Sequence, residues 1–320
     1  MKKVLITGIS GFAGSYLAEF LFSKKEYNIS GTYLLEDSVK KNIGKIKDNI
    51  KLIKVDLTNT KQVNFLIQSV KPDLVFHLAA LSYTADSFKN PLITMENNIA
   101  SQMNILSAIK ENSLLNTKVL VVSSAEVYGL VKKDDLPIDE ETKLMPASPY
   151  AVSKIAQDFL GLYYFLSYNL KIVRVRPFNH IGPRQSPNFA VSAFARKIAE
   201  IEKKRMEPVI YVGNLTPKRD FTDVRDMIAA YTLAIEKGKL GEVYNIGSEK
   251  SYKISDILNN LLKLSRVKIK VQVDGSKFRP VDIPELLCDA TKFRKLTNWK
   301  PSIPISTTLK DTLDYWRSIV

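Results

Sequence analysis

The stretch KVLITGISGFAGSYLAEFLF, residues 3–22, decides the fold class. Its first five residues form a short apolar run that is typical of a buried strand. Gly8, Gly11 and Gly14 follow at the spacing that allows a tight turn, close approach of the backbone to a pyrophosphate and close packing of a helix on the strand. Ser15 to Phe22 then reads as that helix, and the positive end of a helix attracts phosphate. The stretch predicts a dinucleotide-binding unit.

Similar strand-like runs recur along the first 180 residues. Apolar runs rich in Val, Ile and Leu alternate there with longer helix-like segments, which is the pattern of parallel strands joined by crossover helices. The runs are Ile29 to Tyr33, Leu52 to Val55, Leu74 to Leu78, Val119 to Ser123 and Ile172 to Val175, and a last one returns at Glu242 to Ile246. We therefore predict an α/β fold with a doubly wound parallel sheet of the Rossmann type, which binds ligands at the carboxyl ends of its strands.

Prolines interrupt this rhythm after residue 176. The change predicts a smaller, discontinuous C-terminal lobe that lies over the sheet. The predicted boundaries are 1–176 plus about 221–246 for the dinucleotide-binding domain, and 177–220 plus about 247–320 for the substrate-binding lobe.

The composition excludes several classes of protein. The 320 residues are 45% hydrophobic and 25% charged, as in a folded globular chain. No apolar run approaches the roughly 18 to 20 residues that cross a bilayer, so we expect a cytoplasmic protein without membrane contact. Cys288 is the only cysteine, and His77 and His180 are the only histidines, which excludes an internal disulfide and a Cys-rich or His-rich metal site. Catalysis must then use hydroxyls, amines, carboxylates or a bound cofactor.

The net charge of +14 is unevenly placed. Residues 1–170 hold 19 basic and 17 acidic residues, whereas residues 171–320 hold 28 and 16, including all eleven arginines. No nucleic-acid-binding motif accompanies these charges, so we expect no nucleic-acid partner. The basic second half indicates an anionic small substrate, and a merely solvated basic surface is the alternative.

Two short segments carry the candidate catalytic residues. They are SSAEVYG at residues 123–129 and YAVSK at residues 150–154. Tyr150 and Lys154 are four residues apart, so on a helix they share one face, and the ammonium is expected to lower the pKa of the phenol from its usual value of about 10. Ser124 supplies a hydroxyl that can hold a substrate oxygen. Together with the glycine loop, this pattern predicts proton transfer beside a nicotinamide cofactor.

At these residues the chain resembles the extended short-chain dehydrogenases/reductases, the NAD-dependent epimerase/dehydratase family, in the branch that acts on nucleotide-diphosphate sugars. The matching positions extend over essentially the whole length and comprise the glycine loop, Asp56-Leu57, His77-Leu78-Ala79-Ala80, Asn98 with Asn104, Ser124, Tyr150 with Lys154, Arg176-Pro177-Phe178-Asn179 and Arg219-Asp220-Phe221. The resemblance implies that Ser124, Tyr150 and Lys154 are catalytic, and that His77 packs at a strand end.

The resemblance also implies which residues contact the cofactor. They are Gly8, Gly11, Phe12, Ala13, Gly14, Asp56, Leu57, Leu78, Ala79, Ala80, Asn98, Tyr150 and Lys154. An acidic residue ending the second strand would favour NAD, and a nearby arginine would favour NADP. Here the strand ends at Tyr33, the acids Glu36 and Asp37 come later, and only Lys40 or Lys41 could meet a 2′-phosphate. NADP(H) and NAD(H) both stay open.

A nucleotide-diphosphate sugar carries negative charge, which suits the guanidinium groups of the basic half. By the resemblance, the substrate contacts are Ser124, Asn179, Arg184, Arg219 and Arg279. Each arginine could instead be an exposed surface residue.

Within the family, the segments FNHIGPRQS (178–186) and VGNL (212–215) resemble enzymes of GDP-mannose-derived sugars, most closely the GDP-4-keto-6-deoxy-D-mannose reductases. GDP-mannose 4,6-dehydratases are the close alternative, although the short, arginine-free segment from Leu34 to Lys51 counts against them. A dehydratase also needs an acid/base group, which Glu126 could supply. Glu126 could equally cap the next segment. Two alternatives remain: another nucleotide-sugar 4-epimerase or dehydratase, and a non-catalytic dinucleotide-binding sensor.

Two helix-like segments are apolar nearly all round: Ile99 to Ile109, and Ile155 to Leu166. One face of each can pack on the sheet and leave the other for a partner subunit, which predicts a homodimer. The alternative is that the second lobe covers these faces.

Overall fold

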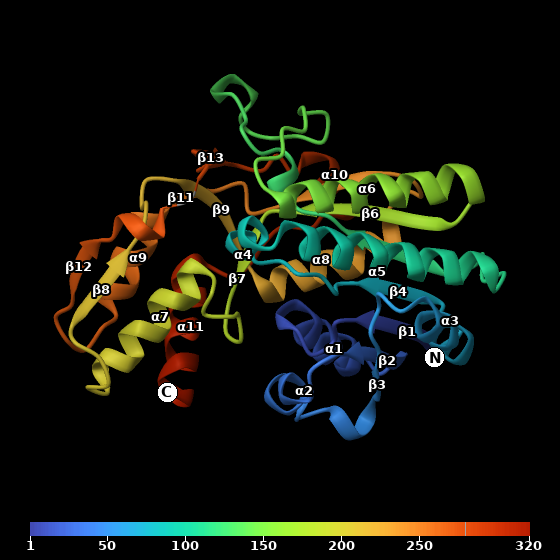
Figure 1. Ribbon diagram of the computed structural model, residues 1–320, viewed down its shortest axis with the longest axis horizontal. Coiled ribbons are helices and arrows are strands. Elements are labelled where there is room, and N and C mark those ends of the chain that lie inside the picture. Colours follow the sequence, from blue (N-terminus) through green and yellow to red (C-terminus); the bar gives the residue numbers. More distant parts are fainter. Residues whose placement is uncertain (279) are drawn as a thin grey trace.

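The computed structural model describes residues 1–278 and 280–320. At its centre lies a seven-stranded sheet in the order β10-β6-β5-β4-β1-β2-β3, in which all neighbours are parallel (Figure 1). The strands are β1 (Lys2–Thr7), β2 (Tyr27–Tyr33), β3 (Lys51–Lys54), β4 (Leu74–His77), β5 (Lys118–Val122), β6 (Lys171–Pro177) and β10 (Val243–Ile246). The predicted α/β fold with a doubly wound parallel sheet is confirmed. Each strand predicted for this sheet begins and ends within two residues of the observed strand.

Helices cover both faces of this sheet. One face carries α1 (Phe12–Lys24), α2 (Glu36–Ile43), α8 (Val224–Lys237) and α10 (Thr291–Thr297), and the other carries α3 (Thr60–Val70), α5 (Pro91–Glu111) and α6 (Pro149–Tyr168). Side chains alternate between the two faces along β1. Val4 and Ile6 pack with α1 and α8, whereas Leu5 packs with α3 and α5. Burial on both sides explains the nearly continuous apolar runs.

The second part of the molecule lies beyond the carboxyl end of the central sheet (Figure 1). It holds a four-stranded sheet in which β9 (Lys218–Asp223) pairs with β7 (Asn179–Ile181), β11 (Ser251–Lys253) and β13 (Glu285–Leu286), and a two-stranded sheet of β8 (Val209–Val212) and β12 (Lys270–Val273). Three helices, α7 (Ala190–Glu202), α9 (Ile254–Lys263) and α11 (Ile305–Ile319), pack around a separate apolar core that includes Ile198, Leu258 and Leu313. The exact lobe boundaries stay a prediction.

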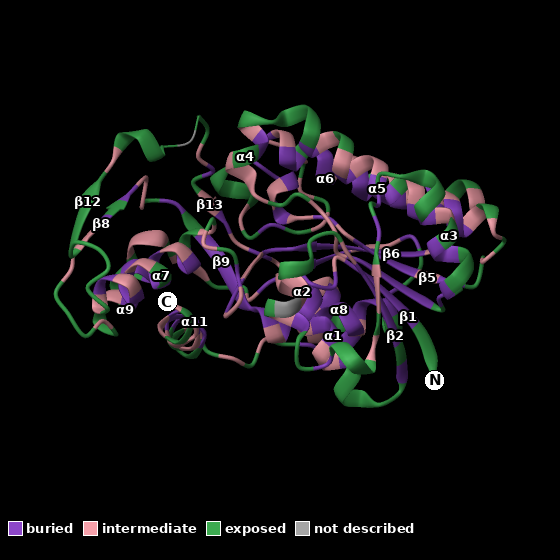
Figure 2. Cartoon of the chain, turned by 60° about the horizontal axis from the view of Figure 1, so that its bottom comes forward, coloured by how far each residue is buried: buried purple, intermediate pink, exposed green. Residues whose placement is uncertain are grey.

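Short helices lie in the connections: α4 (Thr84–Lys89) and the 3-10 turns η1 (Lys47–Asn49), η2 (Ala125–Val127), η3 (Lys133–Asp135) and η4 (Gly275–Lys277). Burial is deepest in the central strands and on the sheet-facing sides of α1 and α8, whereas α5 and α6 expose their outer sides (Figure 2). Within the described ranges, no helix is both long and apolar enough to cross a membrane. Those residues also contain no group of three or more His, Cys, Asp or Glu that could hold a metal ion.

Helix α6 carries two of the candidate catalytic residues, and its sequence fixes where it begins. The Ser148 hydroxyl accepts a hydrogen bond from the backbone N–H of Ala151 (3.1 Å), and Pro149 occupies the first turn, where its missing N–H costs nothing. The helix ends at Asn169, which adopts a left-handed conformation with φ of 54°. A fixed start places Tyr150 and Lys154 in the first two turns, next to the carboxyl ends of β4 and β5.

Candidate active site

The glycine loop between β1 and α1 has the shape that a pyrophosphate requires. A Cβ atom on Gly14 would lie 2.2 Å from the Gly8 carbonyl oxygen, and Gly8 itself has φ of +67°, so neither position accommodates a side chain without strain. Helix α1 begins at Phe12, and its N-cap residue, Gly11, has no side chain that could cap the first turn. The N–H groups of that turn are therefore left for an anion. The loop fits the predicted dinucleotide.

The loop after β4 lies against the glycine loop. Thr7 Oγ1 accepts hydrogen bonds from the backbone N–H groups of Leu78 (3.1 Å) and Ala79 (3.2 Å), and a Cβ on Gly8 would lie 3.0 Å from Ala79 Cα. Further along this loop, Leu81 N–H donates to Asn98 Oδ1 (2.8 Å), while Asn98 Nδ2 donates to the Leu81 carbonyl (3.1 Å). The wholly buried Asn98 thus fixes the loop that holds Ala79 and Ala80.

Among the side chains that the structure describes at the adenosine end of the predicted cofactor site, none decides between NAD and NADP. The exposed Asp56 carboxylate accepts a hydrogen bond from the backbone N–H of Thr58 at 2.9 Å. The neighbouring Leu57 is buried. Helix α2 bonds directly to the glycine loop, since Ser38 Oγ donates to Ser10 Oγ (2.7 Å). The Lys41 ammonium lies 5.7 Å from the centroid of the Trp316 ring. The side chain of Lys40 lies outside what the structure describes.

Ser124 and Tyr150 meet at the carboxyl end of β5. Ser124 caps η2 by accepting from the backbone N–H of Glu126 (3.2 Å). Burial raises the pKa of Tyr150 well above its usual value, and a hydrogen bond with Ser124 opposes that rise. The sequence-based expectation that Lys154 lowers this pKa was therefore wrong. The physical reason is that burial of the phenol, which disfavours the charged phenolate, is the largest influence on this pKa.

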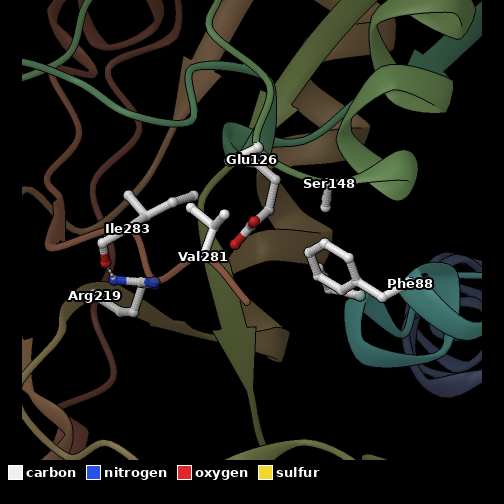
Figure 3. Close-up of a pocket in the computed structure, with 8 residues that line it drawn as sticks. Phe88, Glu126, Ser148, Arg219, Val281 and Ile283 are labelled. Carbon is white, nitrogen blue, oxygen red and sulfur yellow. Dashed lines mark hydrogen bonds between the residues drawn. The ribbon is translucent and has the colours of Figure 1, made fainter. Parts of the chain in front are cut away.

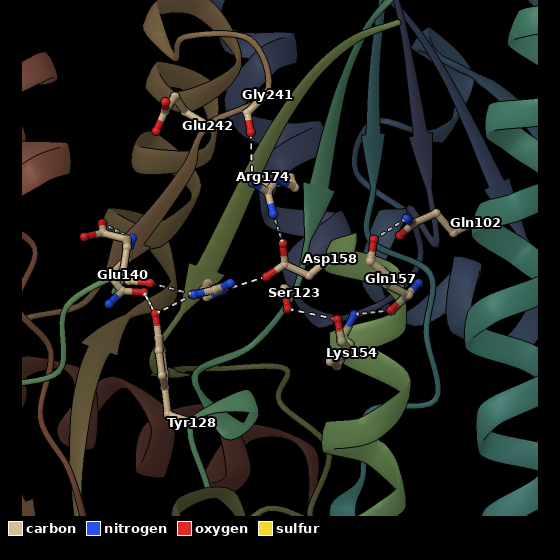
Figure 4. Close-up of polar contacts among 12 residues, drawn as sticks. Gln102, Ser123, Tyr128, Glu140, Lys154, Gln157, Asp158, Arg174, Gly241 and Glu242 are labelled. Atoms are coloured by element: carbon tan, nitrogen blue, oxygen red, sulfur yellow. Dashed lines mark hydrogen bonds and ion pairs between the residues drawn. The ribbon is translucent and has the colours of Figure 1, made fainter. Parts of the chain in front are cut away.

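The Lys154 side chain is buried at the centre of a hydrogen-bond network (Figure 4). Its ammonium donates to the Val122 carbonyl (2.7 Å) and to Gln157 Oε1 (2.8 Å). Burial lowers the pKa of Lys154 to about 7, although the negative charge of Asp158 acts in the opposite direction. The amine is thus poised to change charge near neutral pH.

One turn further along α6, Asp158 pairs with two arginines of β6. Its carboxylate accepts from Arg174 Nη1 and from Arg176 Nε, both at 2.6 Å, and the carboxylate is wholly buried (Figure 4). Arg176 also donates to the Tyr128 hydroxyl (3.0 Å). This network joins α6 to the central sheet beneath the catalytic face. Gln157 and Asp158 were not predicted from the sequence, although their positions three and four residues after Lys154 are the signal that would have placed them beside it.

A small pocket is lined by Glu126 and Ser148, each of which lies two residues from a predicted catalytic residue in the chain (Figure 3). Its lining combines one carboxylate, one guanidinium, two hydroxyls and apolar side chains, from Thr84, Phe88, Glu126, Ala147, Ser148, Arg219, Val281 and Ile283. Arg219 Nη1 donates to the carbonyls of Lys218 (2.7 Å) and Ile283 (2.8 Å), which orients the guanidinium at the pocket wall. Glu126 acts on Tyr150 electrostatically and raises its pKa further. The pocket therefore places a carboxylate near the reacting phenol.

The remaining predicted substrate residues lie in different places. Asn179 is in β7, opposite Phe221 of β9. Arg184 instead reaches helix α1, where Nη2 pairs with Glu19 (2.8 Å) and the guanidinium lies 4.4 Å from the centroid of the Tyr16 ring. Arg279 lies outside the described residues. The substrate roles of these three residues stay predictions.

The sequence profile of the GDP-mannose 4,6 dehydratase family matches residues 5–312. The chain belongs to this family. Family membership confirms the predicted resemblance to extended short-chain dehydrogenases/reductases, and with it an NAD(P)-dependent enzyme that modifies a nucleotide sugar.

Relatives within the family carry out more than one reaction. The chain is 31% identical over 319 residues to the GDP-6-deoxy-D-mannose reductase of Pseudomonas aeruginosa, covering 100% of this chain and 98% of the relative. It is also 31% identical over 335 residues to the human GDP-mannose 4,6 dehydratase, covering 96% of this chain and 89% of the relative. Identity alone therefore does not separate the two reactions.

Solved structures of similar chains contain either nicotinamide cofactor. The structure of RMD from Pseudomonas aeruginosa complexed with NADPH superposes with a TM-score of 0.87 at 30% identity and covers 100% of both chains. The UDP-glucose 4-epimerase of Thermus thermophilus in complex with NAD gives a TM-score of 0.88 at 26% identity, covering 99% of this chain and 100% of that one. Both cofactors occur on this fold.

Proposed function

We propose that this chain reduces the C4 ketone of a GDP-4-keto-6-deoxy-hexose with NADPH or NADH, converting GDP-4-dehydro-6-deoxy-D-mannose to GDP-D-rhamnose. The supporting observation is the end-to-end match to a reductase, which covers 98% of that relative, whereas the human dehydratase is covered only to 89%. The match agrees with the short connection between β2 and β3, which holds no arginine.

The arrangement of Ser124, Tyr150 and Lys154 suits this reaction. The reduced nicotinamide supplies the hydride that C4 receives. Tyr150 enters as the neutral phenol, which its raised pKa favours, and gives its proton to the C4 oxygen. Ser124 donates a hydrogen bond to that oxygen while its negative charge develops. The Lys154 ammonium uses two of its three N–H groups for Val122 and Gln157, and the third donates to a hydroxyl group of the nicotinamide ribose.

Cationic side chains beyond the pocket suit the diphosphate of the substrate. Arg219 lines the pocket itself. Further out, Lys197 and Lys277 both donate to the Tyr211 carbonyl, at 3.4 and 3.0 Å. Lys277 also pairs with Asp274 (3.4 Å), so this carboxylate offsets part of the positive charge near the end of β8. Arg184 can join this set only if it leaves Glu19, because the pair occupies its guanidinium.

The position of Glu126 supports a second candidate function, that of a GDP-mannose 4,6-dehydratase. Its carboxylate lines the pocket beside Ser148 and Arg219 (Figure 3), where it could remove the C5 proton after oxidation at C4. The two reactions differ in the fate of the cofactor. A reductase consumes one reduced nicotinamide per turnover, whereas a dehydratase returns the hydride to its own substrate.

This difference gives a direct test. With the keto-sugar present, we expect absorbance of the reduced nicotinamide to fall steadily. Glu126→Gln should keep at least about a tenth of the activity, because a reductase has no obligatory proton for this carboxylate to move and the amide conserves its shape. Consumption of GDP-mannose without net cofactor oxidation, combined with an inactive Glu126→Gln variant, would establish the dehydratase instead.

We further propose a homodimer formed through the outer faces of α5 and α6. Large apolar side chains are exposed there, namely Met103, Val152, Phe159, Tyr163 and Leu166. The second lobe does not bury these side chains, which supports their use at a subunit interface. An exposed apolar surface of this kind is typical of a subunit interface.

Charged substitutions test this interface. Phe159→Glu combined with Leu166→Glu should weaken association by roughly 100-fold or more, because each places a charge in the apolar contact. Sedimentation velocity over a concentration series measures the change. Phe65→Glu is the matched control, since Phe65 is similarly exposed but lies on α3. A wild-type chain that sediments as a monomer at high concentration would exclude the dimer.

A further inference from the structure

Gln157 is a buried amide whose orientation is determined by its neighbours. Its Nε2 lies 2.9 Å from the carbonyl oxygen of Asn98, and that oxygen can only accept a hydrogen bond. The NH₂ group must therefore point at Asn98. Consequently Oε1 points at the Lys154 ammonium, at 2.8 Å, and accepts from it.

The second N–H of the same amide is directed at His77. Gln157 Nε2 lies 3.3 Å from His77 Nε2, so that ring nitrogen acts as the acceptor. On the other side of the ring, His77 Nδ1 shares a hydrogen bond with Thr7 Oγ1 at 2.9 Å. Burial lowers the pKa of His77 to about 3, which keeps the imidazole neutral. The same Thr7 hydroxyl accepts from Leu78 and Ala79, in the loop predicted to line the cofactor cleft.

Oxygen acceptors, not a carboxylate, surround the Lys154 ammonium directly. Among the described residues, no ion pair includes Lys154, and its ammonium donates to the Val122 carbonyl and to the Gln157 amide oxygen. The titratable and charged groups around it are His77 of β4, Tyr150 and Asp158 of α6, and the two arginines of β6 that pair with Asp158. A buried ammonium needs such acceptors to keep its proton.

We propose that Gln157 is the positioning residue for the catalytic lysine, and that the Thr7–His77–Gln157 series fixes its amide so that the Lys154 ammonium stays protonated and directed at the nicotinamide ribose. The proposal rests on the proposed function of this site as a nicotinamide-dependent one. It assigns His77, expected from the sequence to be a packing residue, the additional task of orienting the amide.

Cofactor binding tests this proposal without the sugar. The dissociation constant of NADPH and of NADH is measured by fluorescence titration from pH 6 to 9, for the wild type and for Gln157→Leu. Loss of a hydrogen bond to a charged group should weaken binding roughly tenfold or more at pH 7 and move the midpoint of the pH dependence down by about one unit. In Gln157→Glu, the added carboxylate should move that midpoint upward.

Gln102→Leu is the matched control. Gln102 is also a buried glutamine, and its Nε2 donates to the backbone carbonyl of Gln157 at 2.5 Å, without contact to Lys154. We expect the cofactor dissociation constant of Gln102→Leu to stay within about threefold of the wild-type value. Its pH midpoint should stay within about 0.3 pH units of the wild-type midpoint. If Gln157→Leu behaves like Gln102→Leu and Gln157→Glu shifts nothing, the positioning role is overturned. A wild type that binds neither cofactor would instead overturn the proposed function.

Discussion

Tyr150→Phe should lower kcat for keto-sugar reduction by about 10² to 10⁴, the typical contribution of a positioned acid or base. The ring remains buried in the same place, but the proton that reaches the C4 oxygen is absent. Cofactor affinity should change less than about threefold, because the lost hydroxyl bonds to Ser124 and not to the glycine loop. Steady-state rates and a fluorescence titration of NADPH on the same preparations measure both quantities.

Tyr164→Phe provides the control for this substitution. Tyr164 is a second buried tyrosine on α6, and its hydroxyl bonds to Ser107 (2.7 Å). It lies 14 residues further along the helix, or roughly 21 Å at 1.5 Å per residue. Both variants lose a buried hydroxyl, so a rate loss confined to Tyr150→Phe reflects chemistry. Equal rates in Tyr150→Phe and wild type would remove the tyrosine from the mechanism.

Lys154→Met should weaken cofactor binding at least about tenfold and also lower kcat, because the ammonium holds the ribose and no methionine atom can replace its N–H donors.

The same variant tests the electrostatics of the site through stability. The lysine pKa is about 7 in the folded chain, against about 10.4 in an unfolded one, so the unfolded chain binds more protons between these values. Wild-type stability should therefore rise relative to Lys154→Met as pH increases from about 7 to 10.

The slope of this difference cannot exceed about 1.4 kcal/mol per pH unit for a single titrating group. Urea unfolding of both proteins at pH 6, 7, 8 and 9 measures it. Lys118→Met serves as the control for the rate and binding changes, because Lys118 begins β5, at the end of the sheet opposite to the active site. A stability difference that is flat across this range would mean that Lys154 keeps an ordinary pKa when folded.

The fold was predictable because its determinants are local. The glycine loop specifies a strand, a turn and a helix within residues 3–22, and the apolar runs specify strands buried on both faces. Short strands of the second part, such as β7 and β13, were not predicted. Their pairing with β9 is made between residues far apart in the chain, and no local pattern encodes it.

The candidate site was predictable only in part. Spacing on one helix placed Tyr150 and Lys154 on the same face, and a similar argument could have included Gln157 and Asp158. The environment of each group was not accessible from spacing. Arg184 illustrates this point, since the sequence offered it as a substrate contact and the structure pairs it with Glu19 of α1, 165 residues earlier.

The sequence by itself determined the α/β class, the dinucleotide loop and the catalytic residue types, because turn geometry and helix periodicity depend on neighbours in the chain. Only the tertiary structure decided the charge state of those residues. A pKa depends on burial and on groups from other elements. The expectation for Tyr150 was wrong because the folded chain buries its phenol and places the Glu126 carboxylate close enough to raise the pKa further.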